Sequence, residues 1–287
     1  MKREIGSMVC IQPKKEPFCL AAGLRSDFLK QKKVITDSIY KILLVIPCYN
    51  DVERLKVFLP KLVEFLPTWF SILVSDDGSN AENRRALGAL LENLGLEAKD
   101  ERAELLSPLF TEKNTGKGGA ILRGWACSEG FEVVAFTDAD GAVGAEEILR
   151  AGNYFRSQEA EGLAALFASR VKMLGRMVER SLKRHLSGRI FATLVSNLGS
   201  VPAYDTQCGL KFVKADAYKK IAPFLQCQGF AFDVELCLLL RKFGFPILEF
   251  PVDWRDVPGS KVSLIRDSWR MALEVGRIVK RVKKLYV

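Results

Sequence analysis

The 287-residue chain contains one histidine, His185, and therefore lacks the residues that histidine-based chemistry requires. A single histidine excludes metal sites built from several histidines and argues against a Ser-His-Asp mechanism. The seven cysteines are odd in number and scattered, and no pair has the spacing of a Cys-x-x-Cys motif. The sequence therefore predicts neither a disulfide framework nor a zinc site. Reduced thiols fit a cytoplasmic compartment.

Long hydrophobic runs are also absent. A helix that spans a bilayer needs about 20 consecutive apolar residues, and the richest stretch, 230–250, is interrupted by Arg241 and Lys242. The basic residues Lys2 and Arg3 are not followed by the apolar region of a signal peptide. We therefore expect a protein that is neither exported nor integral to a membrane, located in the cytoplasm or at the cytoplasmic face of a membrane.

Charge is abundant but unevenly placed. The net charge is +9, and two segments carry the excess: 170–190 has seven basic residues and one acid, and 261–287 has eight basic residues and two acids. Such asymmetry indicates an anionic partner, and nucleic acid, phosphorylated substrates and anionic lipid head groups all qualify. Solvated basic helix faces are the alternative explanation.

Apolar runs alternate with helical periodicities through the first half of the chain. The expected strands are 42–46, 72–74 and 133–136, with a doubtful or edge strand near 105–110, and the expected helices are 52–66, 81–94 and 117–129. Strand–helix alternation predicts an α/β fold with a Rossmann-like, mostly parallel sheet flanked by helices. Ligands of such sheets lie at the carboxyl ends of the strands.

The second half of the chain is less regular. Expected strands are 163–167, 211–214 and 247–252, and expected helices are 174–198, 232–243 and a basic amphipathic C-terminal helix. No linker separates the halves. We expect an N-terminal extension at 1–38, one domain at 39–260 that includes a C-terminal acceptor-side portion, and a terminal helix at 261–287.

Two carboxylates follow the expected strand 133–136, in the sequence Asp138-Ala139-Asp140. Aspartates two positions apart at a strand end can approach one hard cation, and Mg²⁺ or Mn²⁺ takes oxygen ligands. Aspartates that form an ordinary turn after a strand are the alternative.

Two further segments suit a phosphorylated nucleotide. Residues 114–119 open an expected helix with glycines that allow close backbone approach to a phosphate, and Lys117 adds a positive charge. This pattern is not Walker A, and a plain glycine-rich turn explains it equally well. Asp76 and Asp77 end the second strand and suit a base N–H or a ribose hydroxyl, although a helix cap or Asx turn would use the same residues.

In chain order these segments resemble the inverting family 2 glycosyltransferases of the GT-A fold. The segments that carry the resemblance are 46–50, 74–79, 114–120 and 137–142. Segments 205–211 and 230–236 are similar to those of the dolichyl-phosphate β-glucosyltransferases and their prokaryotic polyprenyl-phosphate relatives. The segment 205–211 differs from that of the dolichyl-phosphate mannose synthases. The resemblance covers roughly residues 41–270 and implies a nucleotide-sugar-dependent hexosyltransferase.

The resemblance also implies roles for single residues. Asp77 or Asp76 would read the uracil, and Asp140, with Asp138, would hold Mg²⁺ or Mn²⁺. Arg170 would face the acceptor phosphate, flanked by the helix of Arg180, Arg184 and Arg189, and Arg255 and Lys261 would belong to a closing loop that contacts phosphates. The residues implied to bind the donor are Pro47, Tyr49, Asn50, Asp76, Asp77, Asn114, Lys117, Asp138, Ala139 and Lys261.

The implied reaction is metal-dependent transfer of glucose from UDP-glucose to a polyprenyl or dolichyl phosphate, with inversion. A phosphate monoester has a second pKa of about 6 and is already ionised, so it needs no protein base. A hydroxyl acceptor on a glycolipid or soluble molecule needs a carboxylate, and Asp233 is the first candidate, ahead of Asp205 and Glu235. An inactive membrane-surface binding module on the same fold is the third possibility.

The expected partners are a nucleotide sugar, a lipid phosphate and an anionic membrane surface, with no nucleic acid. Members of the family are usually anchored by transmembrane helices, which this sequence lacks. The basic segments 170–190 and 261–287 could replace such an anchor, because a basic helix with an apolar face can lie in the membrane interface. The alternative is that both apolar stripes pack onto the core.

Overall fold

The computed structural model describes residues 40–96, 102–158, 161–171, 173–179, 205–257 and 266–285. The expected N-terminal extension, 1–38, lies outside the described residues. Also outside them are Lys261, the segment of the expected helix that carries Arg180, Arg184 and Arg189, and the boundary between the expected main domain and its terminal helix.

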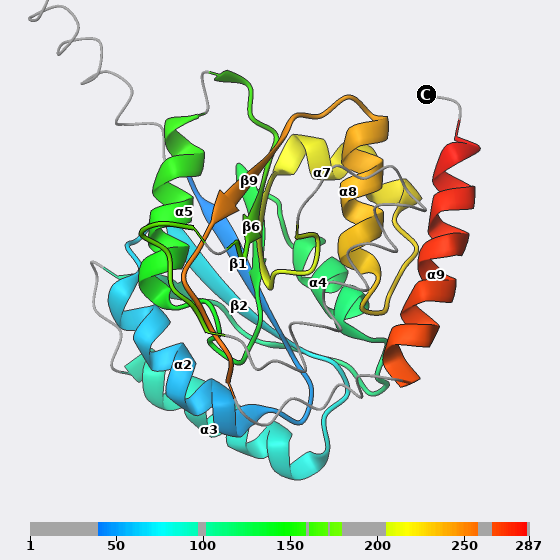
Figure 1. The fold of residues 1–287 in the computed structure, drawn as a ribbon. Helices are drawn as coiled ribbons and strands as arrows, with labels where there is room; N and C mark the ends of the chain where they lie inside the picture. Colours follow the sequence, from blue (N-terminus) through cyan, green and yellow to red (C-terminus); the bar gives the residue numbers. More distant parts are fainter. Residues whose placement is uncertain are drawn as a thin grey trace, which may run out of the picture. The chain divides into compact units, whose positions relative to one another are not determined.

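A mixed, mainly parallel sheet forms the centre of the described chain (Figure 1). Its order is β3-β2-β1-β5-β8-β6-β9, and β4 also pairs with β2. β8 is antiparallel to both β5 and β6, and the other pairs are parallel. The strands are β1 (Ile42–Cys48), β2 (Phe70–Asp76), β3 (Glu104–Leu105), β4 (Leu109–Phe110), β5 (Val133–Thr137), β6 (Ala165–Ser169), β8 (Leu210–Lys214) and β9 (Ile247–Pro251). A separate parallel pair joins β7 (Val178–Glu179) to β10 (Trp254–Arg255).

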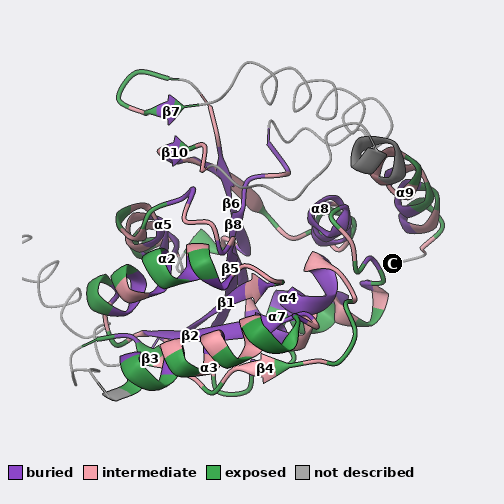
Figure 2. Cartoon of the chain, turned by 90° about the horizontal axis from the view of Figure 1, so that it is seen from below, coloured by how far each residue is buried: buried purple, intermediate pink, exposed green. Residues whose placement is uncertain are grey.

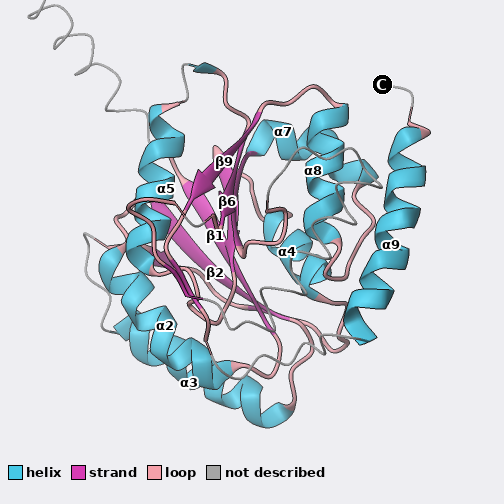
Figure 3. Cartoon of the chain, viewed as in Figure 1, coloured by secondary structure: helices cyan, strands magenta, loops and turns pink. Residues whose placement is uncertain are grey.

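Helices cover both faces of this sheet (Figure 3). One layer holds α2 (Val52–Phe65), α3 (Ala81–Leu96) and α5 (Ala145–Ser157); the other holds α4 (Lys117–Trp125), α7 (Ala215–Ile221) with the short helix η2 (Ala222–Phe224), and α8 (Phe232–Lys242), against which α9 (Arg266–Lys283) packs. In β1, Ile42 and Leu44 join the core of the first layer, while Leu43 and Val45 join the core of the second. The continuous apolar run of this strand therefore serves two faces, as expected of a central strand.

The first-half strands and helices match the sequence expectations closely. The doubtful strand near 105–110 is two short edge strands, β3 and β4, with Pro108 between them, where a missing N–H is tolerated. Helix α5 was not expected, although Ile148, Ala151 and Phe155 have helical spacing and are buried.

The helix expected from residue 174 onward is wrong for its described part. Met173 accepts a hydrogen bond from the Arg176 backbone N–H at 3.1 Å, Gly175 has a φ of 79°, and Val178 lies in strand β7. A turn and a strand therefore stand where the four-residue apolar repeat predicted helix. The rest of the expected helix, 180–198, lies outside the described residues.

The C-terminal helix α9 is formed as expected, but its apolar face is not free. Val275, Ile278, Val279 and Val282 are buried in the core layer that contains α4 and α8. Packing onto the core, and not contact with a membrane, therefore explains this stripe. Among the described residues, none of the helices combines the length and the hydrophobicity needed to cross a bilayer.

Candidate functional site

The carboxyl ends of three parallel strands bring the candidate residues together. β1 lies between β2 and β5, and all three run in the same direction. Residues after β1, Asp76 and Asp77 at the end of β2, and Asp138 and Asp140 after β5 therefore meet at one edge of the sheet. The Asp77 backbone N–H donates to the Cys48 carbonyl at 2.8 Å, which joins two of these strand ends directly.

Asp138 is held by a segment far away in the sequence. Its backbone N–H donates to the Gly209 carbonyl at 2.9 Å, and its carboxylate pairs with the Lys117 ammonium at 2.8 Å. A Cβ atom at Gly209 would lie 2.1 Å from Asp138 Oδ2. The absence of a side chain at Gly209 therefore leaves the space that the Asp138 carboxylate occupies.

Asp140 is the more enclosed of the two candidate metal ligands. The Ala142 backbone N–H donates to Asp140 Oδ1 at 3.0 Å, and the Arg54 guanidinium lies 3.7 Å from Oδ2. Burial and the neighbouring charge of Asp138 raise the pKa of Asp140, while Ala142, Arg54 and Lys117 oppose that rise. Two carboxylates thus repel each other at this turn, and Arg54, which sequence reasoning missed, partly offsets the negative charge.

A chain of alternating charges runs from the core to Asp138. The Lys211 ammonium is fully buried and lies 2.7 Å from Asp233 Oδ1 and 2.8 Å from the Cys208 carbonyl. Asp233 Oδ2 lies 3.7 Å from Lys117, which in turn pairs with Asp138. Burial disfavours the Lys117 charge, but Asp138 and Asp233 outweigh it and raise the pKa of Lys117. The carboxylate of Asp233 is therefore buried between two ammonium groups.

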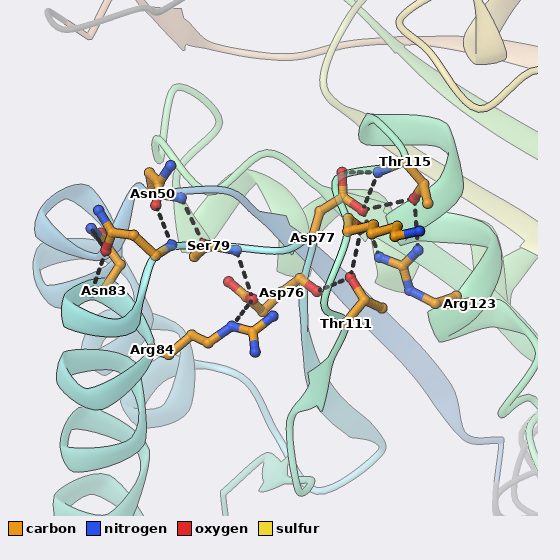
Figure 4. Close-up of polar contacts among 11 residues, drawn as sticks. Asn50, Asp76, Asp77, Ser79, Asn83, Arg84, Thr111, Thr115 and Arg123 are labelled. Atoms are coloured by element: carbon orange, nitrogen blue, oxygen red, sulfur yellow. Dashed lines mark hydrogen bonds and ion pairs between the residues drawn. The ribbon is translucent and has the colours of Figure 1, made fainter.

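Asp77 holds the glycine-rich turn (Figure 4). Its carboxylate accepts hydrogen bonds from the Thr115 backbone N–H at 3.0 Å, the Thr115 hydroxyl at 2.7 Å and the Gly116 N–H at 2.6 Å, and it pairs with Arg123 at 2.8 Å. Burial works against ionisation, but the hydrogen bonds from Arg123, Thr115 and Gly116 lower the pKa of Asp77. Beside it, Asp76 accepts from the Ser79 N–H at 3.1 Å.

Asn50 connects the first loop to the start of α3 (Figure 4). Its N–H donates to the Ser79 hydroxyl at 2.7 Å, and its side-chain oxygen accepts from the Asn80 N–H at 2.8 Å. It has a φ of 49°, a left-handed conformation that asparagine tolerates better than most residues. Tyr49 beside it is exposed. The loop after β1 is thus fixed in shape while it presents an aromatic ring to solvent.

The glycines that begin α4 pack against the protein's own chain. The Gly119 N–H donates to the Gln228 carbonyl at 3.0 Å, and a Cβ atom at Gly118 would lie 2.7 Å from the Cys227 carbonyl oxygen. The buried Glu235 carboxylate holds this loop by accepting from the Gln226 N–H at 3.0 Å and the Cys227 N–H at 2.7 Å. It also pairs with Arg281 of α9. Close packing of the loop therefore accounts for these glycines.

The acceptor-side residues differ in exposure. The Arg170 guanidinium makes two hydrogen bonds to the Asp205 carboxylate, at 2.6 and 2.7 Å. Burial opposes its charge, but Asp205 outweighs burial and raises the pKa of Arg170. Arg255 is exposed, lies 3.6 Å from Glu179, and donates its backbone N–H to the Ala142 carbonyl at 3.0 Å. It therefore flanks the turn that carries Asp140.

The remaining expected donor residues lie around the same edge. Pro47 is part of β1, Ala139 is buried in the turn after β5, and Asn114 is exposed just before the glycine-rich turn. The structure thus brings together the expected residues of the first half. Arg54 has a contact at this site that sequence reasoning did not foresee, and no local sequence pattern marks it. Gly209, Lys211 and Glu235 lie in the segments 205–211 and 230–236, but the sequence did not predict which residues they contact.

Comparison with known proteins agrees with this arrangement. The family model "Glycosyl transferase family 2" matches residues 43–221. Dolichyl-phosphate β-glucosyltransferase of Dictyostelium discoideum is 29% identical over 260 residues, which covers 87% of this chain and 77% of the relative. The Saccharomyces cerevisiae protein of the same name is 30% identical over 245 residues, which covers 80% and 72%.

A solved structure shares the fold. Glucosyl-3-phosphoglycerate synthase of Mycobacterium tuberculosis, in complex with Mn²⁺, uridine diphosphate and glucosyl-3-phosphoglycerate, superimposes with a TM-score of 0.59. The sequences are 13% identical, and the superposition covers 96% of this chain and 88% of that one. At this identity the likeness concerns the fold alone.

Proposed function

Because the chain belongs to glycosyl transferase family 2, whose model matches residues 43–221, we propose that it transfers glucose from UDP-glucose to a polyprenyl phosphate such as dolichyl phosphate, with inversion. The names of the relatives that are 29–30% identical support this donor sugar and acceptor. The observation that carries the choice of acceptor is the buried Asp233 carboxylate, paired with Lys211 at 2.7 Å. A carboxylate held in this way is poorly placed to take a proton from a hydroxyl.

A phosphate acceptor needs no such base. Its second pKa is about 6, so the attacking oxygen is already ionised near neutral pH. The protein must instead stabilise the negative charge of the acceptor phosphate. Arginine suits this task because its planar guanidinium binds phosphate with two parallel hydrogen bonds. Arg255 beside the Asp140 turn and, outside the described residues, Lys261 are proposed to contact phosphate. Arg170 is proposed to face the acceptor phosphate while two of its nitrogens stay bonded to Asp205, so its contact would be through the remaining one. Asp233 positions Lys117 in this scheme.

We assign a divalent cation, Mg²⁺ or Mn²⁺, to Asp138 and Asp140. The fit rests on the donor set: Asp138 and Asp140 present carboxylate oxygens from one turn after β5, and oxygen is the ligand that these cations prefer. Burial and the charge of Asp138 raise the pKa of Asp140, as expected for two carboxylates held close together. Such sites combine one or two carboxylates with substrate phosphates. When bound, the cation supplies a Lewis acid for the departing diphosphate. The Mn²⁺ and uridine diphosphate bound to the M. tuberculosis synthase support this assignment.

The donor nucleotide is assigned to the edge formed by β1, β2 and α4. Tyr49 offers an exposed ring, and Asn50 holds the first loop in place. Asp77 acts by fixing the turn at Thr115 and Gly116, and the exposed Asn114 precedes that turn. Pro47, Asp76, Lys117, Asp138 and Ala139 complete the proposed donor contacts.

The choice of donor is tested by thermal unfolding in the presence of several nucleotide sugars. UDP-glucose with Mn²⁺ is expected to raise the Tm, since a ligand at 100 times its Kd stabilises the folded state by about 2.7 kcal/mol. UDP-glucose without metal should give a smaller shift. GDP-mannose with Mn²⁺ should give none, and a larger shift with GDP-mannose than with UDP-glucose would contradict the proposed donor.

Replacing Gly209 with alanine tests the packing around Asp138. The new Cβ atom would lie 2.1 Å from Asp138 Oδ2, so the carboxylate must turn away from Lys117. We expect transfer to fall about 100-fold, as for a displacement of about 1 Å at a reacting centre, with the fold retained by circular dichroism. Gly88→Ala is the matched control, because nothing lies within 4 Å of a Cβ atom there. Equal activity of the two variants would contradict this role of Gly209.

A further inference from the structure

We propose that the turn formed by residues 173–177 inserts its apolar side chains into the interface of an anionic bilayer and brings the site to a membrane-bound acceptor. The inference rests on the proposed lipid-phosphate acceptor. The apolar face of α9 packs on the core through Val275, Ile278 and Val282 and is therefore not available for this contact. We call the turn formed by Met173, Leu174, Gly175, Arg176 and Met177 the apolar turn.

The apolar turn concentrates exposed hydrophobic surface in a short segment. The Leu174 side chain is fully exposed, and half of Met173 and of Met177 is exposed, at 51% and 53%. Exposed apolar residues that occur singly, such as Val57 on α2 and Leu273 on α9, are ordinary on protein surfaces. Three within five residues form a patch of the kind that marks an interaction site.

The turn is held outward by its own hydrogen bonds. The Arg176 N–H donates to the Met173 carbonyl at 3.1 Å, and the Met177 N–H donates to Asp253 Oδ1 at 2.8 Å. The Trp254 N–H donates to the Met177 carbonyl at 2.9 Å, and Arg176 lies 3.3 Å from Glu147 of α5. A turn fixed in this way does not have to be ordered when it binds, which lowers the entropic cost of insertion.

The position of the turn fits the proposed chemistry. Trp254, which bonds to the turn, is followed by Arg255, whose N–H donates to the Ala142 carbonyl in the turn that carries Asp140. The apolar turn therefore lies on the acceptor side of the site, and Figure 2 shows the exposed segment before β7 extending beyond the main sheet. A lipid phosphate at the membrane surface would approach the site from this side.

Charge selects a bilayer as the occupant. The segment 170–190 carries seven basic residues and one acid, and it includes the apolar turn. Two of the seven lie among the described residues, Arg170 and Arg176, and they pair with Asp205 and Glu147; the excess of positive charge is a property of the sequence around the turn. Basic residues beside inserted apolar side chains are attracted to anionic lipid head groups. A protein partner with an apolar groove, or a second copy of this chain, would not require the basic excess. These occupants are the outcomes that the experiment must separate from a membrane.

The test is co-sedimentation of the full chain with vesicles of phosphatidylcholine that contain phosphatidylglycerol. Met173→Ser/Leu174→Ser should weaken binding about tenfold or more, because it removes the burial of at least one large apolar side chain. The matched control is Val57→Ser/Leu273→Ser, which alters two exposed apolar residues on α2 and α9 and should bind as the wild type does. Removing phosphatidylglycerol should also weaken wild-type binding.

Three outcomes would overturn the inference: the turn variant binds vesicles as tightly as the wild type, the wild type does not bind vesicles, or the substitutions change only the oligomeric state in light scattering. Transfer is measured in parallel with a short, water-soluble prenyl phosphate, for which the turn variant should equal the wild type. Failure of every chain to use that acceptor would contradict the proposed function, whereas vesicle binding would still decide the role of the turn.

Discussion

Replacing Asp140 with asparagine is expected to lower the rate of glucose transfer about 100-fold or more while the protein stays folded. A bound cation contributes several kcal/mol to the stabilisation of developing charge, and each 1.36 kcal/mol changes a rate tenfold. Asparagine keeps an oxygen that can accept the hydrogen bond from Ala142, but it removes the charge that holds the metal. The measurements are transfer from UDP-glucose and the Mn²⁺-dependent rise in Tm with uridine diphosphate.

The second measurement makes the prediction specific to the metal. In Asp140→Asn, uridine diphosphate should give the same small rise in Tm with and without Mn²⁺. The control is Glu53→Gln, which neutralises an exposed carboxylate on α2 near the same edge of the sheet and should leave both measurements unchanged. A full metal-dependent rise in Tm in Asp140→Asn would exclude Asp140 as a ligand.

Replacing Lys211 with methionine is expected to reduce the free energy of unfolding by about 3–5 kcal/mol, the usual cost of removing one partner of a buried ion pair. Lys211 is completely buried, and among the described residues its loss leaves Lys117, at 3.7 Å, as the cation paired with the buried Asp233. Lys219→Met on the exposed side of α7 is the control and should change the stability by no more than about 0.5 kcal/mol. Urea denaturation measures all of these values.

A double variant separates the loss of an ion pair from the loss of packing. Lys211→Met/Asp233→Leu removes both charges and should recover much of the lost stability, because a buried ion pair replaced by apolar residues is often neutral. It should remain poorly active, since Lys117 then lacks the carboxylate that lies 3.7 Å from its ammonium. A double variant as unstable as the single one would show that packing at Lys211, and not its charge, is what matters.

The sequence was sufficient for the central strands and for the family. The apolar runs 42–46, 72–74 and 133–136 predicted the strands β1, β2 and β5, and the polar residues after them predicted the edge at which the candidate site lies. The expected fold, family and enzyme class are confirmed by the sheet and by the match to residues 43–221. These features are local in sequence, so a local pattern can predict them.

The contacts that shape the site are not local. β8 inserts antiparallel between β5 and β6, which brings Lys211 under Asp233 and Gly209 against Asp138. These contacts depend on the order of the strands in the sheet, and the spacing of apolar residues along the sequence does not reveal that order. The sequence around Lys211 does not show that its side chain is buried. The position of Arg54 in its helix likewise does not show that its side chain lies near Asp140.

The wrong helix expected from residue 174 and the choice left open for the apolar stripe of α9, between the core and a membrane, have a common physical cause. The spacing of apolar residues predicts that a segment has an apolar face. It does not predict whether that face packs on the core, on another molecule or against solvent. In α9 the stripe of Val275, Ile278 and Val282 is covered by the core. In the expected helix from residue 174, the apolar residues belong instead to an exposed turn and the strand β7. Tertiary packing decided both cases.

The most direct test of the proposed function is the identity of the product formed from UDP-glucose and a polyprenyl phosphate in the presence of Mn²⁺ or Mg²⁺. The expected products are uridine diphosphate and a polyprenyl phosphate that carries glucose in the β configuration, with equal amounts of the two measured by chromatography and the anomer by nuclear magnetic resonance. Release of free glucose only, or glucose attached to a hydroxyl in preference to the lipid phosphate, would contradict the account.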